Sequence, residues 1–174
     1  MPLIIPLLAL ILLAGLAGLA LGGLSLIIWL PTKTKDLARI MRLADLGSAD
    51  IFYDLGCGDG RVAFYIAGKT GAQVTGLELA WPLYLFCLIR RSVSRCKNPV
   101  FRCSDLFKVD LSRANVVYVF GIPDKLASKL KPKLERELKP GSKVISYAFA
   151  INGWTPAQID RPTEQAIPIF LYVL

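Results

Sequence analysis

The chain has 174 residues, a formal net charge of +8 and no histidine. This length suits one domain with a small appendage, and without histidine neither a His-based catalytic triad nor a His-ligated metal site is possible. The four cysteines match no zinc-ligand spacing, so we expect no metal and interpret them as free thiols. The positive charge is compatible with nucleic acid, anionic lipid or an acidic protein partner.

Residues 3–30, LIIPLLALILLAGLAGLALGGLSLIIWL, carry no charged side chain. Roughly 20 apolar residues suffice for a transmembrane helix. A cleaved signal peptide would have a basic start and an apolar core of only about 7–15 residues. We therefore predict one retained transmembrane anchor over residues 1–30, in contact with the bilayer through residues 3–30. By the positive-inside rule, the rest of the chain lies on the cytoplasmic side, because basic residues follow closely: Lys33, Lys35, Arg39 and Arg42.

Two further features concern the anchor and its continuation. Ala14, Gly18 and Gly22 are spaced four apart, which allows helix–helix association of the anchor, although a stretch rich in Gly and Ala produces this spacing by chance as well. Residues 31–49 are predicted to contain a basic amphipathic linker helix. This helix is interpreted as packing on the edge of the domain or as lying against anionic lipid, and the two are compatible with each other.

From residue 50 onward, strand-like and helix-like segments alternate. Strands are predicted at 50–55, 73–79, 99–103, 115–120, 142–150 and 167–174, and helices at 60–69, 81–95 and 123–138. Repeated strand–helix–strand units favour an α/β fold with a doubly wound, mostly parallel sheet and helices on both faces. Residues 50–174 suffice for one such domain and leave no room for a second.

The segment FYDLGCGDGR at 52–61 places three glycines at the end of the first predicted strand. Gly56, Gly58 and Gly60 form a G-x-G-x-G loop, which allows backbone N–H groups and the N-terminus of the next helix to approach a ligand. Asp54 precedes the loop. Its carboxylate would repel a pyrophosphate but suits a ligand with an ammonium group.

A second acidic residue, Glu78, ends the next predicted strand, where a carboxylate can accept hydrogen bonds from the two hydroxyls of a ribose. S-adenosylmethionine matches this set of features. It has an amine that an acid can face, a ribose that a second acid can bind, and an extended shape that closely approaching glycines can accommodate. The alternative is a tight turn with a purely structural role. We favour the cofactor, because the three glycines and both acids fall at strand ends.

These residues resemble the class I (Rossmann-like) S-adenosylmethionine-dependent methyltransferases. More narrowly, the chain is similar to the small membrane-anchored protein-lysine methyltransferases that modify the ATP synthase c subunit and the adenine nucleotide translocase. The segments that carry the resemblance are Pro31–Thr32, 53–62, 76–79, 104–112, 117–123 and Trp154–Pro156. The sequence departs from the narrower family at Ala80–Pro82, where an Asn-Pro-Trp type of turn is expected.

The resemblance implies a role for each matching position. Asp54 and the three glycines would hold the methionine end, Glu78 the ribose, and Asp105 the adenine amino group, with Leu106 or Phe107 against the ring. The full expected cofactor set is Asp54, Leu55, Gly56, Cys57, Gly58, Gly60, Glu78, Leu79, Asp105 and Leu106. Asp105 is also compatible with a helix N-cap or a surface acid, and Arg61 with a solvated residue.

The segment after the fourth strand bears on the methyl acceptor. Enzymes that methylate planar amino groups typically carry Asn/Asp-Pro-Pro-Tyr/Phe here, whereas this chain has Phe120-Gly121-Ile122-Pro123. We therefore favour an aliphatic lysine amine, whose methylation needs positioning and desolvation more than acid–base catalysis. Phe120, Pro123 and Trp154 are candidate walls of an acceptor channel, and each is equally compatible with ordinary core. We identify no catalytic base.

The sequence thus predicts a single-pass membrane enzyme with its catalytic domain in the cytoplasm, methylating a lysine of a membrane-associated protein. Two alternatives remain open: methylation of a membrane lipid or small amphiphile, and a non-catalytic cofactor-binding membrane module. The uncharged run that opens the helix at 81–95 is either core or rests on the bilayer. Nucleic acid is not an expected partner, because no stacking aromatic residues interleave with the basic ones.

Overall fold

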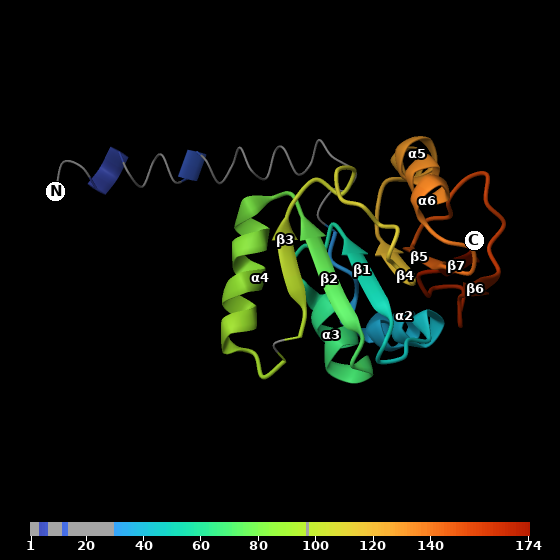
Figure 1. Cartoon of the computed structure of the whole chain (residues 1–174), viewed down its shortest axis with the longest axis horizontal. Coiled ribbons are helices and arrows are strands. Elements are labelled where there is room, and N and C mark those ends of the chain that lie inside the picture. The colour runs from blue at the N-terminus through green and yellow to red at the C-terminus, as the bar shows by residue number, and fades with distance from the viewer. Residues whose placement is uncertain (1–3, 7–11, 14–29, 97) are drawn as a thin grey trace.

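A seven-stranded sheet in the order β3-β2-β1-β4-β5-β7-β6 forms the centre of the domain (Figure 1). The computed structural model describes residues 4–6, 12–13, 30–96 and 98–174. The strands are β1 (Ile51–Leu55), β2 (Gln73–Glu78), β3 (Val100–Cys103), β4 (Val116–Val119), β5 (Lys143–Tyr147), β6 (Gln158–Asp160) and β7 (Ile169–Val173). Strands β1 to β5 are mutually parallel, and β7 runs antiparallel between β5 and β6. The prediction of a mostly parallel α/β sheet is confirmed.

Helices cover both faces of this sheet (Figure 1). They are η1 (Thr34–Asp36), α2 (Leu37–Ala44), α3 (Arg61–Thr70), α4 (Trp81–Val93), α5 (Pro123–Lys125), η2 (Leu126–Leu130) and α6 (Lys131–Glu137). Helices α2, α3 and α4 pack on one face with one cluster of buried side chains, while η2 and α6 contribute to a second cluster on the other face. The two clusters hold the sheet between them as a doubly wound core.

The central strands are apolar on both sides because both of their faces are covered. In β1, Phe52 faces the α2–α3–α4 layer and Leu55 faces the η2–α6 layer, and both are fully buried. Side chains alternate along a strand, so Asp54 lies on the same side as Phe52. A carboxylate therefore stands at the end of an otherwise apolar strand, on the face that α3 covers.

The predicted helix at 123–138 is divided in the structure. A turn of π-helix, η2, separates α5 from α6, and Pro132 lies in the first turn of α6. Proline has no N–H to donate to the preceding turn, and a widened turn is one way for a helix to absorb that loss. Leu126, Leu130 and Leu134 nevertheless stay buried on the sheet, so the division does not break the apolar face.

Residues 31–49 are tied closely to the domain. Leu37 and Ile40 of α2 are buried in the first core cluster. The Arg39 guanidinium donates to Asp160 Oδ1 at 2.8 Å and to Asp36 Oδ1 at 2.9 Å. Helix α2 therefore buries its apolar side against the domain, as the first of the two interpretations of the linker predicts.

The predicted transmembrane span lies almost entirely outside the described residues. Only residues 4–6, 12–13 and 30 of it are described. In the described parts of the chain, no helix combines the length and the apolar character needed to cross a bilayer. The anchor over residues 1–30 therefore remains a prediction.

The connection from β3 to β4, residues 104–115, contains no helix. It is held by α6 instead, because Lys133 Nζ donates to the Val109 carbonyl at 2.7 Å and to Glu137 Oε2 at 2.6 Å. The Leu111 amide donates to the same carboxylate at 3.2 Å. This small polar cluster fixes the loop that begins with Asp105.

Candidate cofactor and acceptor site

The carboxyl ends of β3, β2 and β1 lie side by side, because these parallel strands are neighbours in the sheet. This edge brings together the three acidic residues expected from the sequence: Asp54 in β1, Glu78 at the end of β2 and Asp105 just after β3. The Ser104 amide donates to the Glu78 carbonyl at 3.1 Å, which ties the last two together. A ligand bound along this edge would contact all three strand ends, as in other open α/β sheets.

Asp54 carries an unsatisfied buried oxygen. The residue is 1% exposed; its carboxyl accepts a hydrogen bond from the Ala63 amide in the first turn of α3, while Oδ2 has no partner within the described structure. Burial raises the pKa of Asp54 to about 8, and the nearby charges of Glu78 and Asp59 add to the shift. Buried polar atoms are nearly always paired, so this oxygen marks a place for a donor from a ligand.

The glycine loop has a backbone that other residues adopt with difficulty. Gly56, Gly58 and Gly60 have φ angles of 74°, 56° and 74°, in the left-handed region that glycine tolerates. The Gly56 and Cys57 amides both donate to the Leu77 carbonyl, at 2.8 and 2.9 Å. The loop is thereby tied to β2, and α3 begins directly after Gly60, which directs its N-terminus at the same place.

Glu78 joins the loop to the start of α4. Its Oε2 accepts from the Gly58 amide at 2.8 Å and its Oε1 accepts from the Ala80 amide at 2.8 Å. Burial raises the pKa of Glu78 despite these hydrogen bonds. Each carboxylate oxygen has further lone pairs, so this position can also accept from the hydroxyls of a ribose.

The other expected cofactor residues fall in two groups. Cys57 and Leu79 lie next to the glycines and Glu78. The hydrogen bond with Cys87 and burial raise the pKa of the Cys57 thiol, which therefore stays protonated. Leu55 and Leu106 are buried in the second core cluster. Asp105 Oδ1 accepts from the Phe107 amide at 3.0 Å, so this acid also shapes the turn in which Leu106 lies.

Arg61 has a role that the sequence did not reveal. The sequence was compatible with a solvated residue here. In the structure its guanidinium is bidentate to Asp59, with Nε–Oδ1 at 2.9 Å and Nη2–Oδ2 at 2.7 Å, and it also donates to the Thr32 carbonyl at 3.0 Å. Burial alone would raise the pKa of Asp59, but the hydrogen bonds and charge of Arg61 outweigh it and lower the pKa. Arg61 thus connects the glycine loop to the segment at residues 30–32.

Two tyrosines complete this side of the site. Tyr118 of β4 is in register with Asp54, and its hydroxyl lies 2.6 Å from Thr32 Oγ1. Tyr147, at the end of β5, donates to Asp36 Oδ2 at 2.7 Å. Burial raises the pKa of both tyrosines, so both phenols stay protonated at neutral pH. Only the fold reveals this contact, because Thr32 and Tyr118 are far apart in sequence.

An apolar pocket of about 200 Å³ adjoins the cavity that contains Asp54. Its described lining is Leu30, Phe120, Gly121, Ile122, Pro123 and Phe149. Leu30 and Phe120 also line the cavity beside Asp54, together with Thr32 and Tyr118. The Phe120 ring meets Tyr147 edge-on at 4.9 Å between centroids. Two of the three candidate channel residues, Phe120 and Pro123, therefore line this pocket, and Phe120 also lies beside the glycine loop.

Trp154, the third candidate, is not among the residues that line this pocket. Its ring packs on Tyr172 at 5.3 Å, and its indole N–H donates to Glu135 Oε1 at 2.8 Å. Phe149 lines the pocket in which Trp154 was a candidate wall. Its carbonyl accepts from Ser146 Oγ at 2.6 Å, and Ala148 before it has a φ of 70°, an unusual backbone that re-aims the chain after β5.

Comparison with known proteins identifies the family. Residues 54–158 match the ANTKMT methyltransferase domain. A protein-lysine N-methyltransferase from Saccharolobus islandicus is 36% identical over 155 residues, covering 84% of this chain and 92% of that protein. The chain belongs to the ANTKMT methyltransferase domain family.

Two further proteins show how far the similarity extends. A lysine N-methyltransferase from Xenopus laevis, named for the c subunit of ATP synthase, is 34% identical over 131 residues, which is 74% of this chain and 54% of that protein. The chain thus spans about half the length of this relative. A crystal structure of an RNA methyltransferase from Salinibacter ruber in complex with S-adenosyl-L-homocysteine has a TM-score of 0.76 and 30% identity, covering 83% of this chain and 93% of that one.

This methyltransferase uses S-adenosylmethionine, and its residues fit that cofactor. The unpartnered oxygen of Asp54 suits the ammonium group of the methionine end, and the glycine loop provides a backbone that approaches closely. Glu78, at the end of β2, can accept from the ribose hydroxyls. Asp105 and the turn after it lie at the end of the neighbouring strand, on the side expected for the adenine.

Proposed function

We propose that this methyltransferase is held at a membrane and transfers methyl groups to the side-chain amine of a lysine in a protein substrate. The observation that carries the proposal is the apolar pocket bounded by Phe120, Pro123 and Phe149, directly beside the cofactor cavity. Its apolar lining suits an aliphatic side chain that ends in a small amine. A planar amide or base would need polar groups that this described lining does not offer.

The pocket also accounts for proton removal without a dedicated base. Moving a lysine ammonium from water into apolar surroundings lowers its pKa, so the side chain enters as the neutral amine. Tyr118 and Tyr147 have raised pKa values and cannot accept the proton at neutral pH. Bound S-adenosylmethionine supplies a methyl group already activated by its sulfonium. The residues of the chain then act by orienting the amine and excluding water.

The names of the relatives support lysine as the acceptor. The Saccharolobus islandicus relative is a protein-lysine N-methyltransferase that aligns over nearly its full length, and the Xenopus laevis relative is named for the c subunit of ATP synthase. Membrane attachment of this chain is supported by the uncharged residues 3–30 and the basic residues after them. With this charge distribution the domain lies on the cytoplasmic side of a single span.

Two other acceptors are weaker candidates. A lipid or amphiphile with a phosphate next to its amine would need a cation in the pocket, and the described lining has none. RNA is the acceptor class in the description of the Salinibacter ruber structure. In this chain, however, the described lining of the pocket has no polar side chain to recognise the edge of a base.

A transfer assay with methyl-labelled S-adenosylmethionine tests the proposal. Purified full-length chain in detergent is incubated with membranes, and separately with total RNA, from a host that lacks the gene. The control is Asp54→Asn, which keeps the shape of the side chain but removes its charge. We expect label in a protein band, methyl-lysine after acid hydrolysis, and none of this with the variant.

The other outcomes are distinct. Label that is extracted with organic solvent would indicate a lipid acceptor, and label in RNA would indicate a nucleic acid. Either result overturns the lysine proposal while leaving the methyltransferase assignment intact. Flotation of the full chain with liposomes tests the membrane part separately, and a chain that stays in the aqueous fraction would contradict it.

A further inference from the structure

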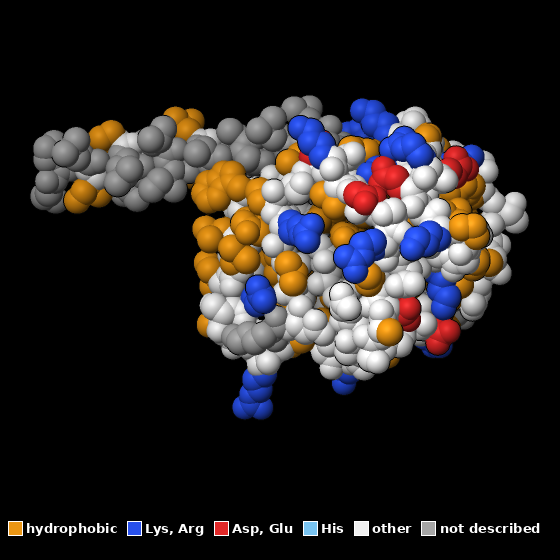
Figure 2. Space-filling view, in the orientation of Figure 1, with side chains coloured by type: hydrophobic (Ala, Val, Ile, Leu, Met, Phe, Trp, Pro, Cys, Tyr) orange, Lys and Arg blue, Asp and Glu red, His pale blue; other side chains and the backbone are white. Residues whose placement is uncertain are grey.

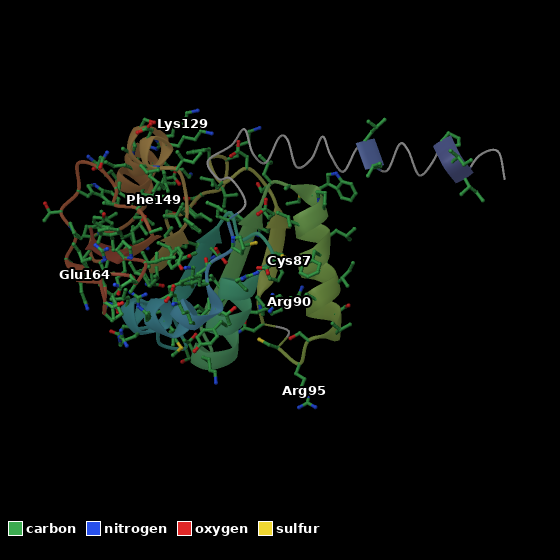
Figure 3. The ribbon with its side chains drawn as sticks, turned by 180° about the vertical axis from the view of Figure 1, so that it is seen from behind. Cys87, Arg90, Arg95, Lys129, Phe149 and Glu164 are labelled. Atoms are coloured by element: carbon green, nitrogen blue, oxygen red, sulfur yellow. The ribbon has the colours of Figure 1, made fainter. Side chains whose placement is uncertain are left out.

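Helix α4 has an inner side that holds the cofactor loop. Cys87 is fully buried, and its thiol donates to the Gly58 carbonyl at 3.1 Å. Arg90 Nη1 donates to the Asp59 carbonyl at 3.1 Å, with its guanidinium 4.7 Å from the centre of the Phe64 ring. Figure 3 shows both side chains in the space between α4 and the rest of the domain. The contacts of this inner side therefore suffice to attach α4 to the rest of the domain.

The outer side of the same helix is apolar and exposed. It carries Trp81, Leu85, Phe86, Ile89 and Val93. At 3.6 residues per turn these positions fall within one arc of the helix surface. Ile89 is 57% exposed and Val93 81% exposed. Of the two interpretations of this apolar run, burial in the core does not account for its outer side, since Cys87 is the one residue of α4 that is buried.

This outer stripe lies at one end of the molecule. Helix α4 packs on β2 and on the edge strand β3, with the rest of the domain to one side of it (Figure 1). Figure 2 shows the hydrophobic side chains gathered over this end. Monomeric proteins rarely expose so continuous an apolar patch without a partner.

Basic residues accompany the stripe. Arg91 lies in the last turn of α4, and Arg95 just beyond it extends away from the domain (Figure 3). Arg102 of the neighbouring strand β3 is also exposed. No acidic residue occurs between Trp81 and Cys103. An apolar helix face with basic residues beside it is the pattern of helices that lie in the plane of an anionic bilayer.

We propose that the outer side of α4 lies on the surface of an anionic lipid bilayer and so orients the catalytic domain. The occupant is argued from charge complementarity and from the chain itself, since the uncharged residues 3–30 immediately precede the domain. The contact extends the proposed membrane attachment, because a single span would not by itself fix which side of the domain faces the bilayer. It does not depend on which acceptor is methylated.

The test uses the full chain with a fluorescent probe at one position. In a background of Cys96→Ser and Cys103→Ser, Ile89→Cys is labelled with an environment-sensitive nitrobenzoxadiazole. The matched control is Ile159→Cys: Ile159 is also an isoleucine, is 54% exposed, and lies on β6 at the opposite edge of the sheet. Both proteins are reconstituted in liposomes of phosphatidylcholine and phosphatidylglycerol with brominated acyl chains, which quench probes that enter the bilayer.

We expect the probe at position 89 to shift to the blue and to lose most of its emission, while the probe at 159 keeps its own. Replacing phosphatidylglycerol by phosphatidylcholine should reduce the loss at position 89, because surface attraction to anionic lipid is electrostatic. A Leu85→Glu substitution on the same stripe should reduce it further, with cofactor affinity unchanged.

Other outcomes would overturn the contact. Equal quenching at positions 89 and 159, or none at 89, would mean that α4 does not face the bilayer. A blue shift at 89 without quenching, growing with the ratio of protein to lipid, would mean that a second copy covers the stripe. If the chain does not float with the liposomes at all, membrane attachment itself fails, which is a different result from a floating chain with an unquenched probe.

Discussion

The two ends of the proposed reaction path are built in different ways. At the carboxyl ends of β1 and β2, the cofactor side is polar, with carboxylates at Asp54 and Glu78 and a backbone bent at three glycines. At the ends of β4 and β5, the acceptor side is apolar and shaped by Phe120 and Phe149. The first end recognises charge and hydrogen-bonding groups, whereas the second recognises shape.

This difference has a consequence for how each end can be altered. A polar site loses a large free energy when one charged group is removed, because its partner is left unpaired. An apolar pocket loses positioning more gradually, through the volume and fit of its walls. Substitutions on the two sides should therefore separate cofactor affinity from the rate of transfer.

The largest effect is expected for Asp54→Asn. Removing the charge that faces the buried ligand position should weaken S-adenosylmethionine or S-adenosylhomocysteine binding by about 100-fold or more. Calorimetry measures this affinity. The control is Asp50→Asn at the opposite end of β1, where the carboxylate accepts from the Gly47 amide at 2.7 Å. If Asp54→Asn binds as tightly as the native chain, the ammonium contact is wrong.

Asp54→Asn should weaken cofactor binding, but it should stabilise the ligand-free protein against unfolding. The pKa of Asp54 is raised in the folded state to about 8 from its ordinary value of 3.8. Its contribution to the free energy of unfolding is therefore fully present below about pH 4 and is lost as the pH rises through 8. Without ligand, Asp54→Asn should melt higher than the native chain near pH 8, and the difference should shrink towards pH 4. Thermal unfolding across this range measures the difference.

A pH series on the native chain is expected to give the next largest effect. Below pH 8 the empty site holds Asp54 mainly protonated, so binding an ammonium must displace that proton. Affinity should fall about tenfold for each pH unit between 8 and 6. Calorimetry in two buffers of different ionisation enthalpy should detect a released proton. An affinity that does not change over this range would show that Asp54 is already ionised before binding.

On the acceptor side, Phe149→Ala should lower kcat/KM for transfer by roughly tenfold through looser positioning, with cofactor affinity nearly unchanged. Trp154→Ala is the comparison, because Trp154 packs on Tyr172 away from the pocket. It should lower the melting temperature but leave the transfer rate of the folded protein intact. The reverse pattern would move the acceptor channel to Trp154.

The smallest effect is expected for Thr32→Val, which removes the buried hydrogen bond to the Tyr118 hydroxyl. One such bond is worth about 1 kcal/mol, so cofactor affinity should weaken by about fivefold. Thr34→Val, at an exposed position two residues away, should bind normally. Stopped-flow measurement of cofactor dissociation would show whether the change lies in the release rate.

Much of the cofactor side could be predicted because its signals are local in sequence. The pattern consists of a strand that ends near Asp54, the alternating glycines, and an acid at the end of the next strand. It can be recognised as soon as the order of strands and helices is known. The seven-stranded order and the antiparallel β7 agree with the doubly wound fold that this pattern predicts. The short strand β6 was not predicted, because three residues carry too little periodicity.

The rest could not be predicted because it depends on contacts between distant segments. Arg61 reaches Thr32 across 29 positions, and nothing in the residues around either one indicates that contact. Trp154 was a candidate channel wall, but Phe149 lines the pocket instead, and nothing in the residues around Ala148 indicates its positive φ. The apolar run of α4 was compatible with either core or bilayer, because hydrophobicity alone does not tell which side a helix presents to its domain.

The unpartnered oxygen of Asp54 finally bears on how long the protein survives in a cell. A site that is empty keeps a buried acid without a full set of partners, while an occupied site gains stability by mass action, about 2.7 kcal/mol at a cofactor concentration 100 times Kd. Proteases remove chains in proportion to the fraction that unfolds. We therefore expect the abundance of this enzyme to follow the supply of S-adenosylmethionine, so that starved cells lose the protein as well as its activity.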